Sequence, residues 1–139
     1  MMRNQSGMPD PTAEAAISNV ILEQCHTAKR PLVYICCSGL PDGFNVSLLG
    51  RCCAYAVERR RTPLAPQLFF PLFLGEERTA GQREASWAMR RQMLKVCREL
   101  WWFGDKPTQL TRKEIQTAVY NGLTIRHFTS DCQEISIKY

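Results

Sequence analysis

The sequence predicts a three-layer α/β protein with a mainly parallel sheet and helices on both faces. Residues 31–38 form an apolar run that is too continuous for a half-exposed strand, which indicates a central strand of a parallel sheet. Helical and strand patterns then alternate, with short connections, as far as residue 128. Such an alternation predicts a parallel sheet whose two faces are both covered by helices.

The first helix after this strand is expected at residues 46–60. Its apolar positions have the spacing of an amphipathic helix, and they are Val46, Leu49, Cys53 and Val57. A short second strand is expected at residues 62–66. Residues 67–75 contain three phenylalanines and are expected to form a loop rich in aromatic side chains.

The second half of the chain repeats this order. We expect a helix at residues 79–97 and a strand at residues 99–105, which ends in a Gly-Asp turn. The next helix is expected at residues 111–121. Thr111 is its expected N-cap, and Glu114 follows three residues later in the capping-box position.

The last elements are expected to be a buried strand and an edge strand. Asn121-Gly122 ends the preceding helix, because a glycine suits the left-handed position that follows a helix. Residues 123–128 form the buried strand. The alternation of Ile135 and Ile137 predicts an edge strand or a contact with a neighbouring molecule.

A chain of 139 residues is long enough for one domain with a single core. Residues 1–28 are expected to form a polar arm followed by a helix, which Thr12 caps. Residues 29–130 are expected to form the α/β domain, and residues 131–139 a C-terminal tail.

The composition excludes several classes of protein. Apolar residues make up 45% of the chain, but no run approaches the roughly 20 residues of a membrane span, and the N-terminus lacks the order of a signal peptide. We therefore expect a soluble, cytoplasmic protein with no membrane contact. No phosphate-loop, nucleophile-elbow or dinucleotide motif is present, which excludes kinases and dehydrogenases and predicts no cofactor.

The basic residues leave two interpretations open. The net charge is +5, and 13 of the 18 basic residues are arginines, whose planar side chains suit phosphate and carboxylate groups. Arg59, Arg60 and Arg61 equally fit the end of a helix, where positive charge is favourable and the side chains stay in water. No basic face with interleaved aromatic residues runs along several elements, so nucleic acid is not an expected partner.

The seven cysteines are expected to be reduced and to pack in the core. Their number is odd, and most of them lie inside apolar patterns. Cys36 and Cys37 are adjacent in a strand and point to opposite faces, which suits neither one disulfide nor one metal ion. His26 and His127 have no cysteines at a zinc-binding spacing, so no metal site is expected.

The expected ligand site lies at the carboxyl ends of the strands, where open parallel sheets bind their ligands. Ser38 and Gly39 directly follow the first strand, and a loop of such small residues lets the backbone approach a phosphate or a sugar closely. The loops after the other strands meet the same rim. The candidate ligand-binding residues are Cys37, Ser38, Gly39, Asp42, Asn45, Gln67, Phe69 and Gly104.

Five blocks of sequence stand out along residues 31–128. They are Tyr34-Ile-Cys-Cys-Ser-Gly39, Ala54-Tyr-Ala-Val57, Pro63-Leu-Ala-Pro-Gln-Leu-Phe-Phe-Pro71, Glu99-Leu-Trp-Trp-Phe-Gly-Asp105, and Glu114-Ile with Ala118 and Gly122. In this order and spacing they resemble the small bacterial and phage DUF4406/DUF7768 proteins. Those proteins are similar to nucleoside 2-deoxyribosyltransferases and deoxynucleotide N-glycosidases. The resemblance implies a flavodoxin-like or Rossmann-like sheet and a nucleoside, a nucleotide or a nucleotide-derived signal as the ligand.

The resemblance also implies roles for two carboxylates. In the characterised enzymes of that superfamily, a glutamate at the start of the last helix attacks the anomeric carbon of a deoxyribose, and Glu114 matches it by its place in the pattern. Asp105 is the implied second residue, which orients the sugar or supplies the proton. A carboxylate suits this chemistry because it holds a glycosyl group covalently while an acid protonates the departing base. The related enzymes often complete each pocket with a neighbouring subunit, which implies a homo-oligomer.

The sequence departs from the family pattern at three places. Gln67 occupies the position of a common histidine, and Cys37-Ser-Gly-Leu-Pro41 lacks the arginine of the common Ser-Pro-Tyr-Arg-Gly turn. Thr108-Gln-Leu-Thr111 replaces a Ser-Glu-Gly-Met turn. Three functions therefore stay open. They are an enzyme acting at an N-glycosidic bond, a binder without turnover such as a sensor or a phage-encoded sponge, and an assembly partner that uses only the fold.

Several candidate residues also have a purely structural explanation. Asn45 is the natural cap of the following helix. Phe69 suits stacking on a base, but aromatic residues more often pack in a core or an interface. Glu114 in the capping-box position stabilises a helix without any chemistry, and Asp105 fits an ordinary turn.

Overall fold

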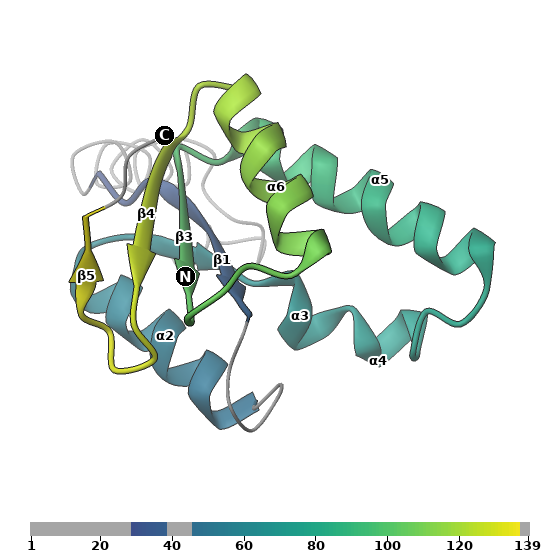
Figure 1. Cartoon of the computed structure of the whole chain (residues 1–139), viewed down its shortest axis with the longest axis horizontal. Coiled ribbons are helices and arrows are strands. Elements are labelled where there is room, and N and C mark those ends of the chain that lie inside the picture. The colour runs from purple at the N-terminus through teal and green to yellow at the C-terminus, as the bar shows by residue number, and fades with distance from the viewer. Residues whose placement is uncertain (1–28, 39–45, 137–139) are drawn as a thin grey trace, which may run out of the picture. The chain divides into compact units, whose positions relative to one another are not determined.

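The computed structural model describes residues 29–38 and 46–136, and the elements named here all belong to one compact unit that begins at Pro31 (Figure 1). In chain order they are β1 (Leu32–Cys37), α2 (Val46–Glu58), β2 (Thr62–Leu64), α3 (Pro66–Phe69), α4 (Pro71–Leu74), α5 (Ala80–Val96), β3 (Glu99–Phe103), α6 (Gln109–Tyr120), β4 (Thr124–Phe128) and β5 (Glu134–Ile135). The predicted arm and helix at residues 1–28 lie outside the described residues.

The five strands form one mixed sheet in the order β2-β1-β3-β4-β5. The first four are parallel, and β5 pairs antiparallel with β4. Ile35 lies opposite Trp101, which lies opposite Arg126 on the next strand. The central place of β1 is confirmed, since it has a partner on each side and its residues from Val33 onward are buried. The mainly parallel sheet is confirmed too.

Helices cover both faces of this sheet, because adjacent residues of a strand point to opposite sides. On one face, Ile35 and Trp101 pack against apolar residues of α2. On the other face, Tyr34 and Trp102 pack against apolar residues of α5 and α6. The protein is therefore built in three layers, as predicted.

The cysteines are divided between these two layers of core. Cys36 lies on the face that α5 and α6 cover, and Cys37 lies on the face that α2 covers. The six described cysteines are all free. The sulfur atoms of Cys37 and Cys52 lie 3.8 Å apart. In the described part of the chain, no group of three His, Cys, Asp or Glu side chains is arranged to hold a metal ion.

The prediction of a loop at residues 67–75 is wrong. Two one-turn helices, α3 and α4, occupy this segment and begin at Pro66 and Pro71. Proline suits the first turn of a helix because its φ is fixed near the helical value and its missing N–H is not needed there. The backbone N–H of Phe70 bonds to the carbonyl of Pro66 at 2.8 Å, and the buried Phe70 ring anchors the segment.

The predicted start of α6 is also wrong, and this changes the interpretation of Glu114. Thr108 is the N-cap, because its backbone is extended and its hydroxyl accepts the N–H of Thr111 at 3.2 Å. Glu114 is therefore the sixth residue of α6 and is too far along the helix to belong to a capping box. The predicted end is confirmed, since Gly122 follows the helix with φ +81°.

The edge strand predicted from Ile135 is confirmed as β5, although Ile137 lies outside the described residues. Arg126 of β4 holds this strand with two hydrogen bonds of 2.7 Å to the carboxylate of Glu134. None of the helices in residues 46–136 combines the length and the apolar character that crossing a bilayer requires.

Candidate functional site

The carboxyl ends of β1 and β3 meet in a close backbone contact. Gly104, directly after β3, has φ +134°, and a Cβ atom there would lie 1.6 Å from the carbonyl oxygen of Ser38. The N–H of Ser38 donates to the carbonyl of Phe103 at 3.0 Å, and its hydroxyl donates to the carbonyl of Lys106 at 3.2 Å. Only glycine fits at position 104, so the backbone itself fixes this rim of the sheet.

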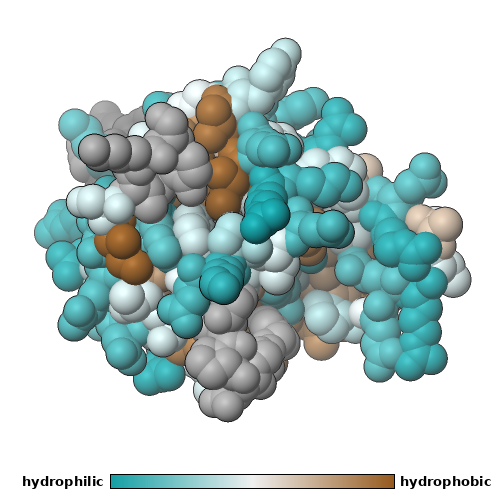
Figure 2. Space-filling view, in the orientation of Figure 1, coloured by the Kyte–Doolittle hydropathy of each residue, from teal (hydrophilic) through white to brown (hydrophobic). Residues whose placement is uncertain are grey.

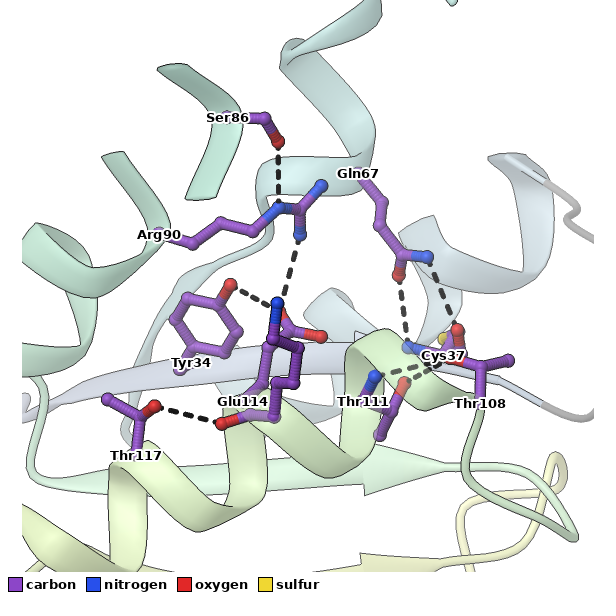
Figure 3. A network of polar contacts seen from close by, with 10 residues as sticks. Tyr34, Cys37, Gln67, Ser86, Arg90, Thr108, Thr111, Glu114 and Thr117 are labelled. Carbon is purple, nitrogen blue, oxygen red and sulfur yellow. Dashed lines mark hydrogen bonds and ion pairs between the residues drawn. The ribbon is translucent and has the colours of Figure 1, made fainter. Parts of the chain in front are cut away.

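Gln67 holds the last residue of β1 from the other side. Its Oε1 accepts the N–H of Cys37 at 3.0 Å, and its Nε2 donates to the carbonyl of Cys37 at 3.3 Å (Figure 3). The paired part of β2 ends opposite Tyr34, so β2 does not reach Cys37. The Gln67 amide takes the place of a strand and fixes the direction in which the chain leaves β1.

Glu114 is a buried carboxylate held by two side chains from other elements (Figure 3). The Tyr34 hydroxyl on β1 donates a hydrogen bond to its Oε2 atom. Nη1 of Arg90 on α5 lies 3.3 Å from the same oxygen. Both side chains of the ion pair are at most 5% exposed. Three elements thus converge on one carboxylate under α5 and α6.

Arg90 is itself fixed on further sides. Its Nε donates to the Ser86 hydroxyl at 3.2 Å, one helical turn earlier in α5. Its guanidinium carbon lies 4.9 Å from the centre of the Phe70 ring. A buried ion pair is weak evidence for a stabilising role, because removing both charges from water costs about as much as their attraction returns. A buried, well-oriented pair of this kind therefore marks a candidate functional site.

The electrostatics of this cluster follow from its burial. Burial raises the pKa of Glu114, and the attraction of Arg90 and the hydrogen bond from Tyr34 offset this only in part. Burial, together with the charge of Glu114, raises the pKa of Tyr34 far above its usual range. The phenol therefore stays protonated and donates a hydrogen bond to Glu114. Burial lowers the pKa of Arg90, but Glu114 and Tyr34 outweigh this effect and raise it. Arg90 therefore stays charged.

Arg90 also connects the buried carboxylate to a hollow of about 160 Å³. The hollow is lined by Gln67, Phe70, Pro71, Gly75 and Arg90. A larger hollow of about 430 Å³ lies along α6 and includes Ile115 and Val119, and Figure 2 shows apolar side chains exposed beside this helix. A third, of about 330 Å³, lies between α5 and α6. We take the smallest as the candidate ligand site, because it includes both the Glu114 partner and Gln67.

Comparison with known families identifies the domain that carries these residues. Residues 31–128 match the family described as "Domain of unknown function (DUF7768)". The chain belongs to this family. No curated protein matches the sequence. The DUF7768 match begins at Pro31, where the compact unit begins, and ends at Phe128, the last residue of β4. It therefore includes β1, β3, α5 and α6, which carry the buried carboxylate.

Within the DUF7768 domain, the predicted site residues fall into separate groups. Cys37, Ser38, Gln67 and Gly104 meet at the ends of β1 and β3. Cys37 takes part there only through its backbone, since its thiol points to the α2 side. Glu114 is buried on the other face of the sheet, which α5 and α6 cover, and contacts Tyr34 and Arg90 there.

The remaining predicted residues lie elsewhere or outside the described chain. Asp105 follows Gly104 directly, but it is exposed. Phe69 is half-buried and packs its ring 5.2 Å from the ring of Phe70. Gly39, Asp42 and Asn45 lie outside the described residues.

Sequence reasoning missed Tyr34, Ser86 and Arg90 as residues of this candidate site. A signal for two of them was present. Ser86, Arg90 and Leu94 are spaced by four residues and occupy the buried stripe of α5, where an arginine needs an ionic partner. Tyr34 lies in an otherwise apolar strand, and a buried phenol usually has a hydrogen-bond partner.

Proposed function

We propose that this protein binds a nucleoside or a nucleotide at the carboxyl ends of β1 and β3, and cleaves or transfers at its N-glycosidic bond through Glu114. The strand order β2-β1-β3-β4-β5 supports a flavodoxin-like fold related to the nucleoside 2-deoxyribosyltransferases, although β5 is antiparallel here. In this order β2, the next strand in the chain after β1, pairs with one edge of β1. The following strand, β3, pairs with the other edge of β1, so the direction in which strands are added reverses there. Such a switch point is where open α/β sheets bind ligands.

The observation that carries the proposal is the environment of Glu114. Its carboxylate is buried, oriented by the Tyr34 hydroxyl, and paired with Arg90. Arg90 in turn borders the hollow. Burial makes an ionised carboxylate less well solvated than in water, while the fixed arginine favours its charged form. These are the conditions in which a carboxylate serves as a nucleophile.

The proposed reaction follows the usual course for a carboxylate nucleophile. A Glu114 oxygen attacks the anomeric carbon, the bond from this carbon to the base nitrogen breaks, and its electron pair goes to the nitrogen, which takes a proton from an acid. Water or a second base then attacks the anomeric carbon, and the ester bond to Glu114 breaks. When water attacks, it releases a proton. Asp105 remains the predicted acid, and Tyr34 orients the nucleophile.

A second candidate function is binding without turnover, as in a sensor or a sponge for a nucleotide-derived signal. One observation favours it: Oε2 of Glu114 is already engaged by both Tyr34 and Arg90, and the residue is only 3% exposed. Gln67 also stands where the family that the sequence resembles commonly has a histidine. Both ends of its side-chain amide are already hydrogen-bonded to the backbone of Cys37. A binder needs only shape and polar contacts, which this rim supplies.

The deciding experiment compares the full-length protein with a Glu114→Ala variant. Each is incubated with deoxynucleosides, nucleotides, NAD and cyclic nucleotides, and ligand and products are followed by mass spectrometry. Release of free base that disappears in the variant supports the enzyme. Retention of an unchanged ligand, which is released on denaturation, supports the binder. If neither occurs while both proteins are folded by circular dichroism, both functions are excluded. The homo-oligomeric state and the cytoplasmic location stay predictions.

A further inference from the structure

Arg90 has an unused donor group on the side of the small hollow, which it lines together with Gln67. Two of its three side-chain nitrogens are engaged, because Nε donates to Ser86 at 3.2 Å and Nη1 donates to Glu114 at 3.3 Å. The third nitrogen, Nη2, donates to none of the residues that the structure describes. Figure 3 shows Nη2 on the side of the guanidinium that faces Gln67, away from Tyr34 and Glu114.

The other residues around the hollow offer a ligand little polarity. Three of them have no polar side-chain group, and these are Phe70, Pro71 and Gly75. Gln67 uses both Oε1 and Nε2 of its amide to hold the backbone of Cys37. Among the side chains that line the hollow, Arg90 is therefore the one with a whole NH₂ group left for a ligand.

The free end of Arg90 is held in a fixed direction. The hydrogen bonds of Nε and Nη1 fix two corners of the guanidinium, and its carbon lies 4.9 Å from the centre of the Phe70 ring. Because the guanidinium is planar, the N–H bonds of Nη2 are fixed by the same contacts. A donor that is already oriented costs little conformational entropy when a ligand binds to it.

The chemistry of this donor limits the ligand group that it can hold. Nη2 only donates hydrogen bonds, so the ligand must supply an acceptor such as a phosphate oxygen or a carbonyl oxygen. The charge of Arg90 is already balanced by Glu114, and burial disfavours both charges. A phosphate would place a second anion on one buried guanidinium, whereas a carbonyl oxygen adds no net charge. The site therefore favours a carbonyl oxygen.

The size and the position of the hollow fit a nucleobase. Its volume of about 160 Å³ corresponds to roughly five water molecules, which suits one ring of a ligand and not a whole nucleotide. The same guanidinium contacts Glu114 through Nη1. A base held by Nη2 thus lies beside the carboxylate that is proposed to attack the sugar attached to it.

We propose that Nη2 of Arg90 donates a hydrogen bond to a ring carbonyl oxygen of the nucleobase, and that this contact selects bases with such an oxygen over adenine. The inference rests on the proposed binding of a nucleoside or a nucleotide. Uracil, thymine, cytosine, guanine and hypoxanthine each have a ring carbonyl group. Adenine has none, and its amino group is itself a donor.

The test is isothermal titration calorimetry on the full-length wild type. The probes are the four common 2′-deoxynucleosides, deoxyuridine and deoxyinosine, their 5′-monophosphates, and analogues in which hydrogen replaces one ring carbonyl oxygen. A probe that the protein cleaves is replaced by its carbocyclic form, which has no anomeric carbon. We expect the loss of the contacted oxygen to weaken binding of the best probe about tenfold or more, and deoxyinosine to bind about tenfold tighter than deoxyadenosine.

The variant Arg90→Lys tests the protein side of this contact. It keeps a cation for Glu114 but removes the second nitrogen of the planar fork. We expect it to weaken binding of the best probe about tenfold or more, and to weaken the analogue without the contacted oxygen no further. A residue that only positions Glu114 would weaken both ligands equally. Arg91→Lys, at the next and exposed position of α5, is the matched control and should leave binding unchanged.

Four outcomes decide between the proposals. If the wild type binds a probe, but no loss of a single carbonyl oxygen weakens it by more than about threefold, the inference is wrong and the proposed function stands. The same holds if Arg90→Lys weakens the 5′-monophosphates alone, because Arg90 then binds a phosphate. If Arg90→Lys does not fold by circular dichroism, the wild-type comparison of probes decides alone. If the wild type neither binds nor cleaves any probe, the proposed function is wrong and the inference falls with it.

Discussion

Nη1 of Arg90 lies 3.3 Å from Oε2 of Glu114 in a region where both side chains are at most 5% exposed. This ion pair links α5 to α6, the two helices that cover one face of the sheet. Burial disfavours both charges, while each charge favours the ionised form of the other. The ion pair therefore affects both the free energy of unfolding and the protonation of Glu114.

Breaking this ion pair from one side should be strongly destabilising. Arg90→Met keeps much of the side-chain volume but leaves Glu114 without its counter-ion, so we expect a loss of about 3–5 kcal/mol in the free energy of unfolding. The double variant Arg90→Met/Glu114→Gln should recover part of this loss, because no uncompensated charge remains. Urea denaturation measures both values. A loss below about 1 kcal/mol in the single variant would contradict a buried, paired Glu114.

The stability that Glu114 contributes should depend on pH in a defined direction. Burial raises the pKa of Glu114 in the folded protein above its ordinary value of 4.5. The folded state therefore binds the proton more tightly than the unfolded state. The contribution is fully present below about pH 4.5 and is lost as the pH rises through the folded-state pKa.

A comparison with Glu114→Gln isolates this effect, because the amide does not titrate. Urea denaturation of both proteins between pH 3 and pH 8 gives the difference in free energy of unfolding, wild type minus variant. We expect the difference to decrease with rising pH above 4.5 and then to level off. A difference that increases over this range would mean that Arg90 and Tyr34 lower the pKa of Glu114 overall.

Gly104→Ala should disrupt the contact between β1 and β3. The new Cβ would lie 1.6 Å from the carbonyl oxygen of Ser38, which is backbone and has little freedom to move. We expect a loss of about 3 kcal/mol or more, from backbone strain and overpacking together. Gly122→Ala is the matched control, since Gly122 also has a positive φ but has no atom within 4 Å of the added Cβ. Its expected cost is about 1–2 kcal/mol, and equal losses in the two variants would refute the close contact.

Gln67→Ala should loosen the end of β1. The substitution leaves the N–H and the carbonyl of Cys37 without their side-chain partner, so we expect a loss of about 1–3 kcal/mol in thermal or urea unfolding. Gln116→Ala on the exposed side of α6 serves as the control and should change the stability by less than about 0.5 kcal/mol. Hydrogen exchange at the Cys37 amide should also become faster in Gln67→Ala and stay unchanged in Gln116→Ala.

The errors of the sequence-based predictions have identifiable causes. Residues 67–75 are expected from their three phenylalanines to form an aromatic loop, but they contain two short helices. Pro66 and Pro71, five residues apart, each start a single turn that a helical period cannot indicate. Thr111 was expected to cap α6, whereas the hydroxyl of Thr108, three residues earlier, accepts the Thr111 N–H. Two threonines at this spacing look alike in a sequence, and only the backbone direction distinguishes them.

The sequence by itself determined the alternation of the longer strands and helices, the central place of β1, and the opposite directions of Cys36 and Cys37. These features depend on local periodicity and on the alternation of side chains along a strand. Only the tertiary structure decided the partners of Glu114. Tyr34 is 80 residues from Glu114 in the chain and Arg90 is 24 residues away. They meet because α5 and α6 pack on the same face of the sheet. A pattern within one segment of the sequence does not show which residues of other segments will contact it.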